Sequence, residues 1–422
     1  MEKICVLGLG YIGLPTAAMF ATHEYQVVGV DVNKEVINVL NKGRIHIEEP
    51  GLKTLVQAAV NSGKLTVQST PEPSDVFIIA VPTPITEGKE ADLSHVVSAA
   101  KSITSSLKPG NLVILEATSP PRTTIDLVQP ILEESGLKGG VDFLLAYSPE
   151  RVLPGKILHE LVNNSRVIGG ITNESAKAGR GLYSSFVEGE ILITDATTAE
   201  MVKLMENTTR DINIAIANEF SRLADKFEVD VWEAIRIANH HPRVNILAPG
   251  PGVGGHCISV DPWFFVEKAP QESQLIKTAR LVNDGQPGFV VQTLQQEYQS
   301  LKGKVFAALG VTYKPNVDDL RESPAIEVIK QLQKAGAKVK AFDPFVKKET
   351  KIVDFMVGDL KEALSNTDGI LLLVNHNQFD HLDPEEIFPI LNKPFVLDTR
   401  NALDKGAWIK AGFQVKTLGD GR

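Results

Sequence analysis

The sequence contains little cysteine and no long apolar runs, and both absences narrow its class. Only two of its 422 residues are cysteines, Cys5 and Cys257, and they lie far apart in different settings, so neither a disulfide framework nor a cysteine zinc cluster is expected. No stretch approaches the roughly 20 continuous apolar residues of a membrane span. Glycines punctuate the apolar run 4–9 and no small-residue cleavage site follows it, so this run predicts a strand rather than a signal peptide.

Positive charge is also in deficit. The chain has 43 Lys and Arg residues against 52 Asp and Glu residues, a formal net charge of −9. Such a chain lacks the basic field of general nucleic-acid and membrane-surface binders, although helix N-termini and a few arginines can still hold a small anionic ligand. We therefore expect a cytoplasmic protein without a nucleic-acid, membrane or metal partner.

The length exceeds what a single hydrophobic core usually organises. Short β-branched runs alternate with helical patterns over residues 1–195 and again over 301–422, which is typical of parallel sheets covered by helices. Residues 196–300 show long helical periodicity instead, with one long helix starting near Ala196. The prediction is α/β: two Rossmann-like doubly wound domains joined by a long helix and a helical middle. The expected strands are 4–7, 26–31, 75–81, 111–115, 143–146, 305–310, 338–342, 368–374 and 395–398.

The two ends of the chain also resemble each other. In each, an apolar strand runs into Gly-x-x-Tyr and a helix, and a second strand ends in an acid, Asp31 in one copy and Asp343 in the other. This repetition predicts a duplicated nucleotide-binding architecture.

Residues 8–13 read Gly-Leu-Gly-Tyr-Ile-Gly between a predicted strand and a predicted helix. Gly8 permits the tight turn, Gly10 lets the backbone approach a pyrophosphate, and Gly13 lets the helix pack on the strand. The Asp31 carboxylate would accept hydrogen bonds from the adenosine ribose and repel a 2′-phosphate, which favours NAD over NADP. Structural turns also produce such glycine patterns, and Asp31 alone could be a turn residue; the strand, loop and helix order argues for the cofactor.

Thr83 and Thr118 follow two further predicted strands. Ligands of open α/β sheets bind at the carboxyl ends of strands, so both threonines are candidates to line the cofactor cleft, although Thr-Pro is also ordinary loop chemistry. The predicted cofactor-binding residues on this face are Gly8, Gly10, Tyr11, Ile12, Gly13, Asp31, Thr83 and Thr118.

The segment 249–262 is the most informative stretch. Its four glycines within six residues leave the backbone free to approach a ligand closely, and they precede Cys257. A structural cysteine normally sits in an apolar run, as Cys5 does, whereas Cys257 lies between His256 and Asp261, where a thiolate and proton transfer are plausible. The alternative interpretation is a buried structural thiol.

Lys203, Asn207 and Arg210 lie on one face of the long predicted helix, by their i, i+4, i+7 spacing. Spacing alone would fit a solvated polar face equally well. Arg243, in the run 241–243, could bind a diphosphate with its planar fork.

Four more candidates lie at predicted strand ends of the second α/β domain. Tyr313, Lys314 and Arg321 occupy its first strand-to-helix loop, and Arg400 follows its last predicted strand. Each could be an ordinary surface residue, and their convergence on strand ends is the argument for a site.

Together these residues resemble the UDP-glucose/GDP-mannose dehydrogenase family, in order and over the whole chain. The motifs that carry the resemblance are Gly8-x-Gly10-x-x-Gly13, Ser148-Pro149-Glu150-Arg151, Ala199-Glu200-x-x-Lys203-x-x-x-Asn207, Gly254-Gly255-His256-Cys257 and Lys314-x-x-x-Asp318-Asp319-x-Arg321-x-Ser323-Pro324. The resemblance implies an NAD-binding domain over 1–195, a helical dimerisation core over 196–300 and a UDP-sugar-binding domain over 301–422. It also implies a homodimer or higher homo-oligomer.

The resemblance further implies a four-electron oxidation of the sugar C6 alcohol to a carboxylate with NAD. Cys257 would capture the intermediate aldehyde as a thiohemiacetal, and water would cleave the resulting thioester. Lys203 and Asn207 would transfer protons and stabilise the oxyanion, while Asp261 and Glu150 would serve water positioning or aldehyde handling. Arg321 would face NAD or the neighbouring domain, and Arg243 would reach the partner's site. The implied substrate contacts are Arg151, Val152, Lys203, Asn207, Arg210, His241, Arg243, Gly254, Tyr313, Lys314 and Arg400.

The cysteine loop departs from the Gly-Gly-x-Cys-x-Pro-Lys-Asp pattern of the UDP-glucose and GDP-mannose branches. It reads Gly-Gly-His-Cys-Ile-Ser-Val-Asp and is similar to the branch that oxidises UDP-N-acetyl-D-mannosamine to the mannosaminuronate used in polysaccharide biosynthesis. UDP-N-acetylglucosamine and UDP-glucose stay open as substrates. Two other classes compete: a two-electron hydroxyacid-type dehydrogenase, which has no catalytic cysteine, and a non-enzymatic NAD-binding module, which would leave Lys203, Asn207 and Cys257 without a purpose.

Overall fold

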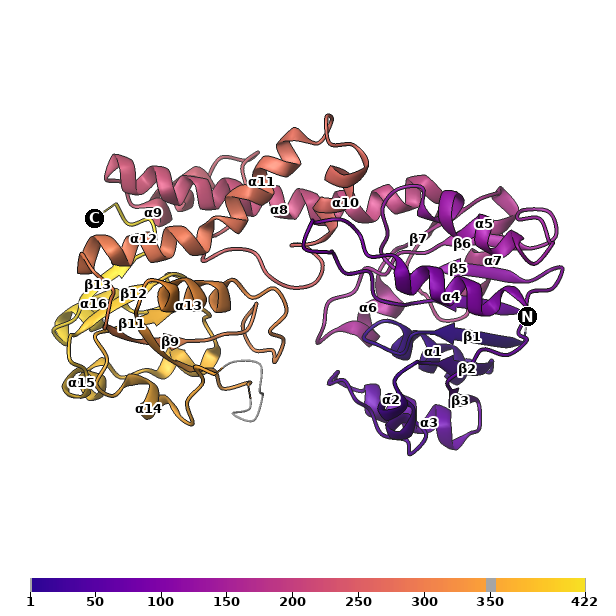
Figure 1. Cartoon of the computed structure of the whole chain (residues 1–422), viewed down its shortest axis with the longest axis horizontal. Coiled ribbons are helices and arrows are strands. Elements are labelled where there is room, and N and C mark those ends of the chain that lie inside the picture. Colours follow the sequence, from indigo (N-terminus) through magenta and orange to yellow (C-terminus); the bar gives the residue numbers. More distant parts are fainter. Residues whose placement is uncertain (1, 347–353, 422) are drawn as a thin grey trace. The chain divides into compact units, whose positions relative to one another are not determined.

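The computed structural model describes residues 2–346 and 354–421 (Figure 1). They form two compact units: Met1–Glu206 with Trp263–Pro270, and Asn207–Pro262 with Gln271–Arg422. The division falls inside α8 (Ala196–Phe227), the long helix that the sequence predicted to start near Ala196. The three-domain boundaries expected from the sequence stay a prediction.

The first unit is built on a mixed sheet with one antiparallel pair. Within residues 2–206 the sheet has eight strands in the order β3-β2-β1-β4-β5-β6-β7-β8, and only the β6/β7 pair runs antiparallel. The first six strands follow the Rossmann order, so the switch point lies between β1 and β4, where a dinucleotide crevice opens. The strands are β1 Lys3–Leu7, β2 Gln26–Val30, β3 Leu65–Gln68, β4 Val76–Ile79, β5 Leu112–Leu115, β6 Leu144–Tyr147, β7 Arg166–Gly170 and β8 Ile191–Asp195.

Helices cover both faces of this sheet because its strands alternate apolar side chains between two cores. Ile4 and Val6 pack against α1, α3, α6 and α7, whereas Cys5 and Leu7 pack against α4, α5 and the start of α8. Cys5 is fully buried, as the sequence suggested for a structural thiol, and burial raises its pKa to about 12. The helices are α1 Gly13–Thr22, α2 Lys34–Leu40, α3 Leu52–Asn61, α4 Ser94–Thr104, a π-helical turn Thr124–Val128, α5 Gln129–Glu133, α6 Ile157–Asn163, α7 Asn173–Tyr183 and α10 Asp261–Lys268.

The second unit contains a smaller sheet of the same class. In its described part the order is β10-β9-β11-β12-β13, all parallel, with the switch point between β9 and β11. Its strands are β9 Val305–Leu309, β10 Lys338–Phe342, β11 Gly369–Leu372, β12 Phe395–Asp398 and β13 Gln414–Thr417. Its helices are α9 Val231–Ala238, α11 Gln274–Asp284, α12 Gln286–Tyr298, α13 Pro324–Lys334, α14 Leu360–Leu364, α15 Pro384–Ile387, α16 Lys405–Lys410 and the 3₁₀ turns Asn377–His381 and Phe388–Ile390.

The predicted duplication is visible in hydrogen bonds. Asp31 accepts the Leu9 N–H at 3.0 Å in the first unit, and Asp343 accepts the Val311 N–H at 2.8 Å at the matching place in the second. The copies differ in one respect: Asp343 is also bonded to the buried His376 at 2.9 Å. The two Rossmann-like domains expected from the sequence are confirmed.

Four strands were not expected. Three of them, β3, β8 and β13, lie at a sheet edge, and their residues mix polar and apolar types. The fourth, β7, lies between β6 and β8 and is buried, but its run Arg-Val-Ile-Gly-Gly has only two large apolar residues. An edge strand buries fewer side chains, so its sequence carries a weaker hydrophobic pattern.

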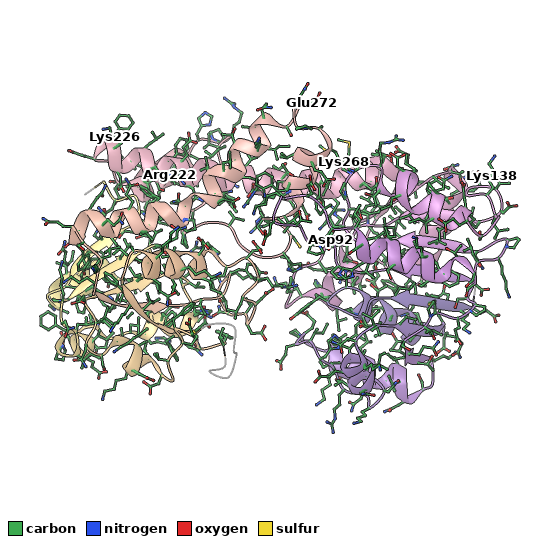
Figure 2. The ribbon with its side chains drawn as sticks, in the orientation of Figure 1. Asp92, Lys138, Arg222, Lys226, Lys268 and Glu272 are labelled. Atoms are coloured by element: carbon green, nitrogen blue, oxygen red, sulfur yellow. The ribbon has the colours of Figure 1, made fainter. Side chains whose placement is uncertain are left out.

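The helical part of the second unit is held by polar contacts between helices. Arg222 reaches from α8 to the α11–α12 corner, where it donates to the Val282 carbonyl at 2.7 Å and to Gln286 Oε1 at 2.9 Å (Figure 2). At the N-terminal end of α8, Asp195 directly precedes the helix and accepts the Thr198 N–H at 2.9 Å as its N-cap.

Candidate functional site

The glycine loop follows β1 at the switch point of the first sheet and is shaped for a dinucleotide. A Cβ on Gly13 would overlap the Gly8 carbonyl oxygen, so helix and loop touch only because residue 13 is glycine. A Cβ on Gly10 would meet nothing within 4 Å, which leaves open space beside the exposed backbone. Ile12 stands immediately before α1, and Asp31 ends in a partly exposed carboxylate. This cradle fits a pyrophosphate over a helix N-terminus with the ribose at Asp31.

The two threonines predicted to line the same cleft meet in the structure. Thr83 follows β4 and Thr118 follows β5, and the Thr83 hydroxyl donates to the Thr118 carbonyl at 2.5 Å. The bond joins the carboxyl ends of the adjacent strands, and both residues are partly exposed there.

The second unit brings three of the predicted catalytic residues together. Asn207 Nδ2 donates to Asp261 Oδ2 at 2.6 Å, and the Asp261 N–H donates to the Cys257 carbonyl at 2.8 Å. Asp261 is 3% exposed and begins α10, whereas Cys257 is partly exposed. A partly exposed cysteine thus lies one turn before a buried carboxylate whose orientation an amide fixes.

Lys203 and Arg210 extend the Asn207 face of α8 in opposite directions along the helix. The four- and three-residue spacings place all three side chains on one face. Lys203 is 8% exposed and lies in the first unit, whereas Arg210 is exposed and lies in the second. Burial of Lys203 argues against the simple solvated-face interpretation.

Glu150 and Arg151 follow β6 in the first unit. Glu150 is 8% exposed and pairs with Arg166 Nη2 at 2.6 Å. Arg151 is held by Glu206, at 2.5 Å between Nη2 and Oε1, and donates to the Ser165 carbonyl at 2.9 Å. Val152 packs against the adjacent apolar core.

The glycine-rich loop packs on the second sheet at its predicted strand-end residues. A Cβ on Gly254 would come within 2.9 Å of Tyr313 Cβ, and the Gly255 N–H donates to the Arg321 carbonyl at 3.0 Å. Arg400 leaves no room for a side chain at Gly250. The glycine-rich loop and these strand-end residues are therefore in contact within the second unit.

Four remaining candidates have simpler surroundings. Lys314 Nζ lies 5.6 Å from the centre of the Tyr313 ring, beside the glycine-rich loop. His241 and Arg243 follow α9 and are exposed. The Arg321 guanidinium pairs with Asp319 in its own loop at 2.6 Å, and that pairing lowers the pKa of Asp319 against the raising effect of burial.

Sequence reasoning missed the polar residues that support these segments. Arg166 opens β7 and is 4% exposed, and Asn218 of α8 is fully buried and accepts the Gly250 N–H at 2.9 Å. Arg280 of α11, 1% exposed, pairs with Asp211 at 2.6 Å. The available signal in the sequence was a charged residue at the start of an apolar run, as in Arg-Val-Ile-Gly-Gly, which indicates a buried charge with a partner.

Residues 2–346 and 354–421 contain neither a membrane-spanning helix nor a metal-binding cluster. No helix in these ranges is long and apolar enough to cross a bilayer. The same residues contain no group of three or more His, Cys, Asp or Glu side chains arranged to hold a metal ion.

A doubly wound sheet with this glycine loop at its switch point is the architecture of dinucleotide-binding domains, the class to which NAD-dependent dehydrogenases belong. The chain belongs to the UDP-glucose/GDP-mannose dehydrogenase family: the family's NAD binding domain matches residues 2–187, its central domain 197–285 and its UDP binding domain 307–405. It is thus an NAD-dependent nucleotide-sugar dehydrogenase, as its sequence predicted.

Similar proteins match along the whole chain. A UDP-N-acetyl-D-mannosamine dehydrogenase of Methanococcus maripaludis is 51% identical and aligns with 100% of this chain and 98% of its own. An NDP-N-acetyl-D-galactosaminuronic acid dehydrogenase of Ralstonia nicotianae is 48% identical over 94% of this chain and 96% of its own. The solved structure of a UDP-D-ManNAc dehydrogenase from Pyrococcus horikoshii is 41% identical, covers 100% of both chains and has a TM-score of 0.93.

Proposed function

We propose that the protein oxidises UDP-N-acetyl-D-mannosamine at C6 to UDP-N-acetyl-D-mannosaminuronate, in two steps that share one cysteine. The observation that supports the chemistry is the hydrogen-bonded set of Asn207, Asp261 and Cys257, in which an amide orients the Asp261 carboxylate and the Asp261 N–H bonds to the backbone of the partly exposed Cys257. The net reaction consumes one water and two NAD⁺ and releases two NADH and three protons. When bound, NAD would accept a hydride in each of the two oxidations.

The chain's residues supply binding and proton transfer. The C6 alcohol gives its proton to Lys203 as it becomes an aldehyde, and the Cys257 thiolate then adds to that carbonyl carbon. The thiohemiacetal oxygen, stabilised by Lys203 and Asn207, returns to a carbonyl as the second hydride leaves, which yields a thioester. Water positioned by Asp261 attacks this thioester, and the Cys257 thiolate leaves. Glu150 acts in aldehyde handling or in the hydrolysis.

The substrate proposal rests on the cysteine loop and on the relatives. The loop has Ser259-Val260 before Asp261, in place of the Pro-Lys pair of the UDP-glucose branch. UDP-N-acetyl-D-mannosamine dehydrogenases at 46–51% identity align with the full length of this chain. The 48% identical galactosaminuronic acid dehydrogenase makes the corresponding galacto sugar the second candidate.

The first experiment is a count of NADH formed per sugar nucleotide consumed. UDP-N-acetylmannosamine, UDP-N-acetylgalactosamine, UDP-N-acetylglucosamine and UDP-glucose are offered separately with excess NAD. Two NADH per UDP-N-acetylmannosamine, with little from the other sugars, is expected. One NADH per sugar would remove the thioester from the mechanism, and a preference for another sugar would overturn only the substrate.

A Cys257→Ala variant is the control for the covalent step. It is expected to bind NAD with unchanged affinity and to form no net carboxylate, because the aldehyde can no longer be captured. Undiminished uronate formation by this variant contradicts the role of Cys257. A Cys5→Ala variant, which changes the buried thiol, is the matched comparison and should keep the NADH count at two.

We further propose that the protein is a cytoplasmic homodimer. An apolar stripe on α8 supports this: Ile216, Phe220, Leu223 and Phe227 recur at helical spacing and are 43%, 38%, 42% and 69% exposed. Such a stripe on a water-exposed face is typical of a protein interface. The exposed Arg243 then reaches the partner's substrate.

A further inference from the structure

A buried charge cluster lies beneath the strand ends of the first unit. Glu116, Glu150 and Arg166 are 2%, 8% and 4% exposed, and they come from three neighbouring strands or their ends. Arg166 Nη1 lies 3.3 Å from Glu116 Oε1, and Nη2 lies 2.6 Å from Glu150 Oε2. One guanidinium therefore pairs with two carboxylates that are shielded from water. Removing one partner of such a buried pair leaves an uncompensated charge, so the three side chains depend on one another.

The guanidinium fixes the segment that carries Glu150. Arg166 Nη1 also donates to the Ser148 hydroxyl at 2.9 Å, so Arg166 holds both ends of Ser148-Pro149-Glu150. The other oxygen of Glu150 accepts the Arg151 N–H at 2.7 Å. Both carboxylate oxygens are thus oriented, and the next two residues are the predicted substrate contacts Arg151 and Val152.

On its other side, the cluster contacts α1, the helix that follows the glycine loop. Glu116 accepts from the Thr16 hydroxyl at 3.3 Å and from the Tyr183 hydroxyl at 2.8 Å. Thr16 lies in the first turn of α1, directly after the glycine loop. The Arg166 guanidinium stacks over the Tyr183 ring at 4.2 Å, which keeps it flat between the two carboxylates.

We propose that Arg166 is a positioning residue for the oxidation: its guanidinium orients Glu150 and ties the Ser148–Glu150 segment, through Glu116, to the first turn of the NAD-binding helix. The proposal rests on the proposed function, since it takes Glu150 to face the sugar. Lys could not replace Arg166, because a single ammonium cannot span Ser148, Glu116 and Glu150 with the geometry of a planar fork.

The cluster has a built-in sensitivity to pH. The charged and titratable groups that face Glu116 are Arg166 of β7, Glu150 after β6 and Tyr183 of α7, and Thr16 of α1 faces it as a neutral donor. Burial raises the pKa of Glu116, against the lowering effect of Arg166, to about 7. Above that pH two full negative charges share one guanidinium, so the hold on Glu150 weakens.

The test uses the full-length enzyme with saturating NAD and its sugar. Arg166→Lys is expected to lower kcat by about tenfold or more while the NAD dissociation constant changes by less than about threefold, because it misorients Glu150 without touching the glycine loop. The Glu116→Gln variant removes the competing charge. Its kcat relative to wild type is expected to rise as pH increases through about 7, where Glu116 of the wild type loses its proton.

Arg122→Lys is the matched control, since it makes the same substitution at an exposed arginine whose guanidinium pairs with Asp126. Its kcat should stay within about twofold of wild type. A wild-type kcat in Arg166→Lys overturns the proposal, and so does a loss of kcat in Arg122→Lys equal to that in Arg166→Lys. If Arg166→Lys does not fold, a pH-independent ratio for Glu116→Gln is the decisive negative result.

Failure of the proposed function gives a different pattern. A changed substrate or one NADH per sugar appears in the wild-type count and leaves the Arg166 comparison intact. An unchanged kcat in Glu150→Gln shows instead that Glu150 does not face the sugar, and it overturns the positioning role.

Discussion

At the scale of single residues, burial decides what each carboxylate does. Asp261, Glu150 and Glu200 are all under 10% exposed, yet each has named donors that replace water. Glu200 stands apart because its donors are structural: it accepts the N–H groups of Arg122 and Thr124 at 2.5 Å and 2.7 Å. It thereby ties the first turn of α8 to the segment after β5, which explains a motif residue without a catalytic role.

Glu200 makes stability depend on pH in a definite direction. Burial raises its pKa from 4.5 to about 7, against the lowering effect of the Thr124 and Arg122 donors. The folded state then binds the proton more tightly than the unfolded state, so the stabilisation is complete below about pH 4.5 and is lost as pH rises through about 7. Relative to Glu200→Gln, the wild-type free energy of unfolding should fall by roughly 3 kcal/mol across that window.

Denaturant titrations of both proteins at a series of pH values measure this difference. Asp75→Asn is the comparison with the opposite sign, because the Glu2 and Lys3 N–H donors lower the pKa of Asp75. The advantage of wild type over Asp75→Asn should therefore disappear as pH falls through the range in which the aspartate is protonated. A difference between wild type and Glu200→Gln that does not vary with pH would contradict the assignment.

At the scale of elements, the glycine-rich loop keeps its shape by resting on helices. Asn218 of α8 accepts the Gly250 N–H at 2.9 Å and donates to Asn283 Oδ1 of α11 at 2.9 Å. Asn283 in turn donates to Asp211 Oδ1 at 2.8 Å, and Arg280 pairs with the same oxygen. This buried chain anchors the start of the loop that ends at Cys257.

Removing the anchor should loosen the loop. Asn218→Ala leaves the Gly250 N–H and the side-chain oxygen Oδ1 of Asn283 without their partner. We therefore expect a loss of about 1–3 kcal/mol in the free energy of unfolding. We also expect a kcat about tenfold lower, since the loop positions Cys257. Asn213→Ala, on the same helix but bonded only locally to the Thr209 carbonyl, is the control and should keep wild-type kcat. Equal activity of the two variants would show that Asn218 does not govern the loop.

At the scale of the whole molecule, the apolar stripe on α8 predicts self-association. Phe220→Asp places a charge in its middle, so an interface that buries the stripe should open and the protein should sediment as a monomer. The monomer should bind NAD normally and lose sugar turnover, because Arg243 no longer reaches a partner's site. Lys138→Asp introduces the same acid in an exposed loop of the first unit, and this variant should sediment like the wild type (Figure 2). A dimer of Phe220→Asp would place the interface elsewhere.

Much of this protein was determined by local sequence. The glycine loop 8–13, Asp31 and the segment 254–257 carry their chemistry in consecutive or regularly spaced residues, so the fold class, the cofactor and the family followed from them. The core strands followed too, because strands buried on both faces read as apolar runs. Edge strands such as β8 did not, since few of their side chains are buried.

Only the tertiary structure decided which distant polar groups meet. Asn207 and Asp261 are 54 residues apart, and Glu116 and Arg166 are 50 apart, yet each pair is in hydrogen-bond contact. A buried polar group must find a partner, but many residues of the chain could serve, so spacing cannot select one. The packing of strands and helices decides which polar groups pair. These pairs include the ones that hold the segments of Cys257 and Glu150 in place.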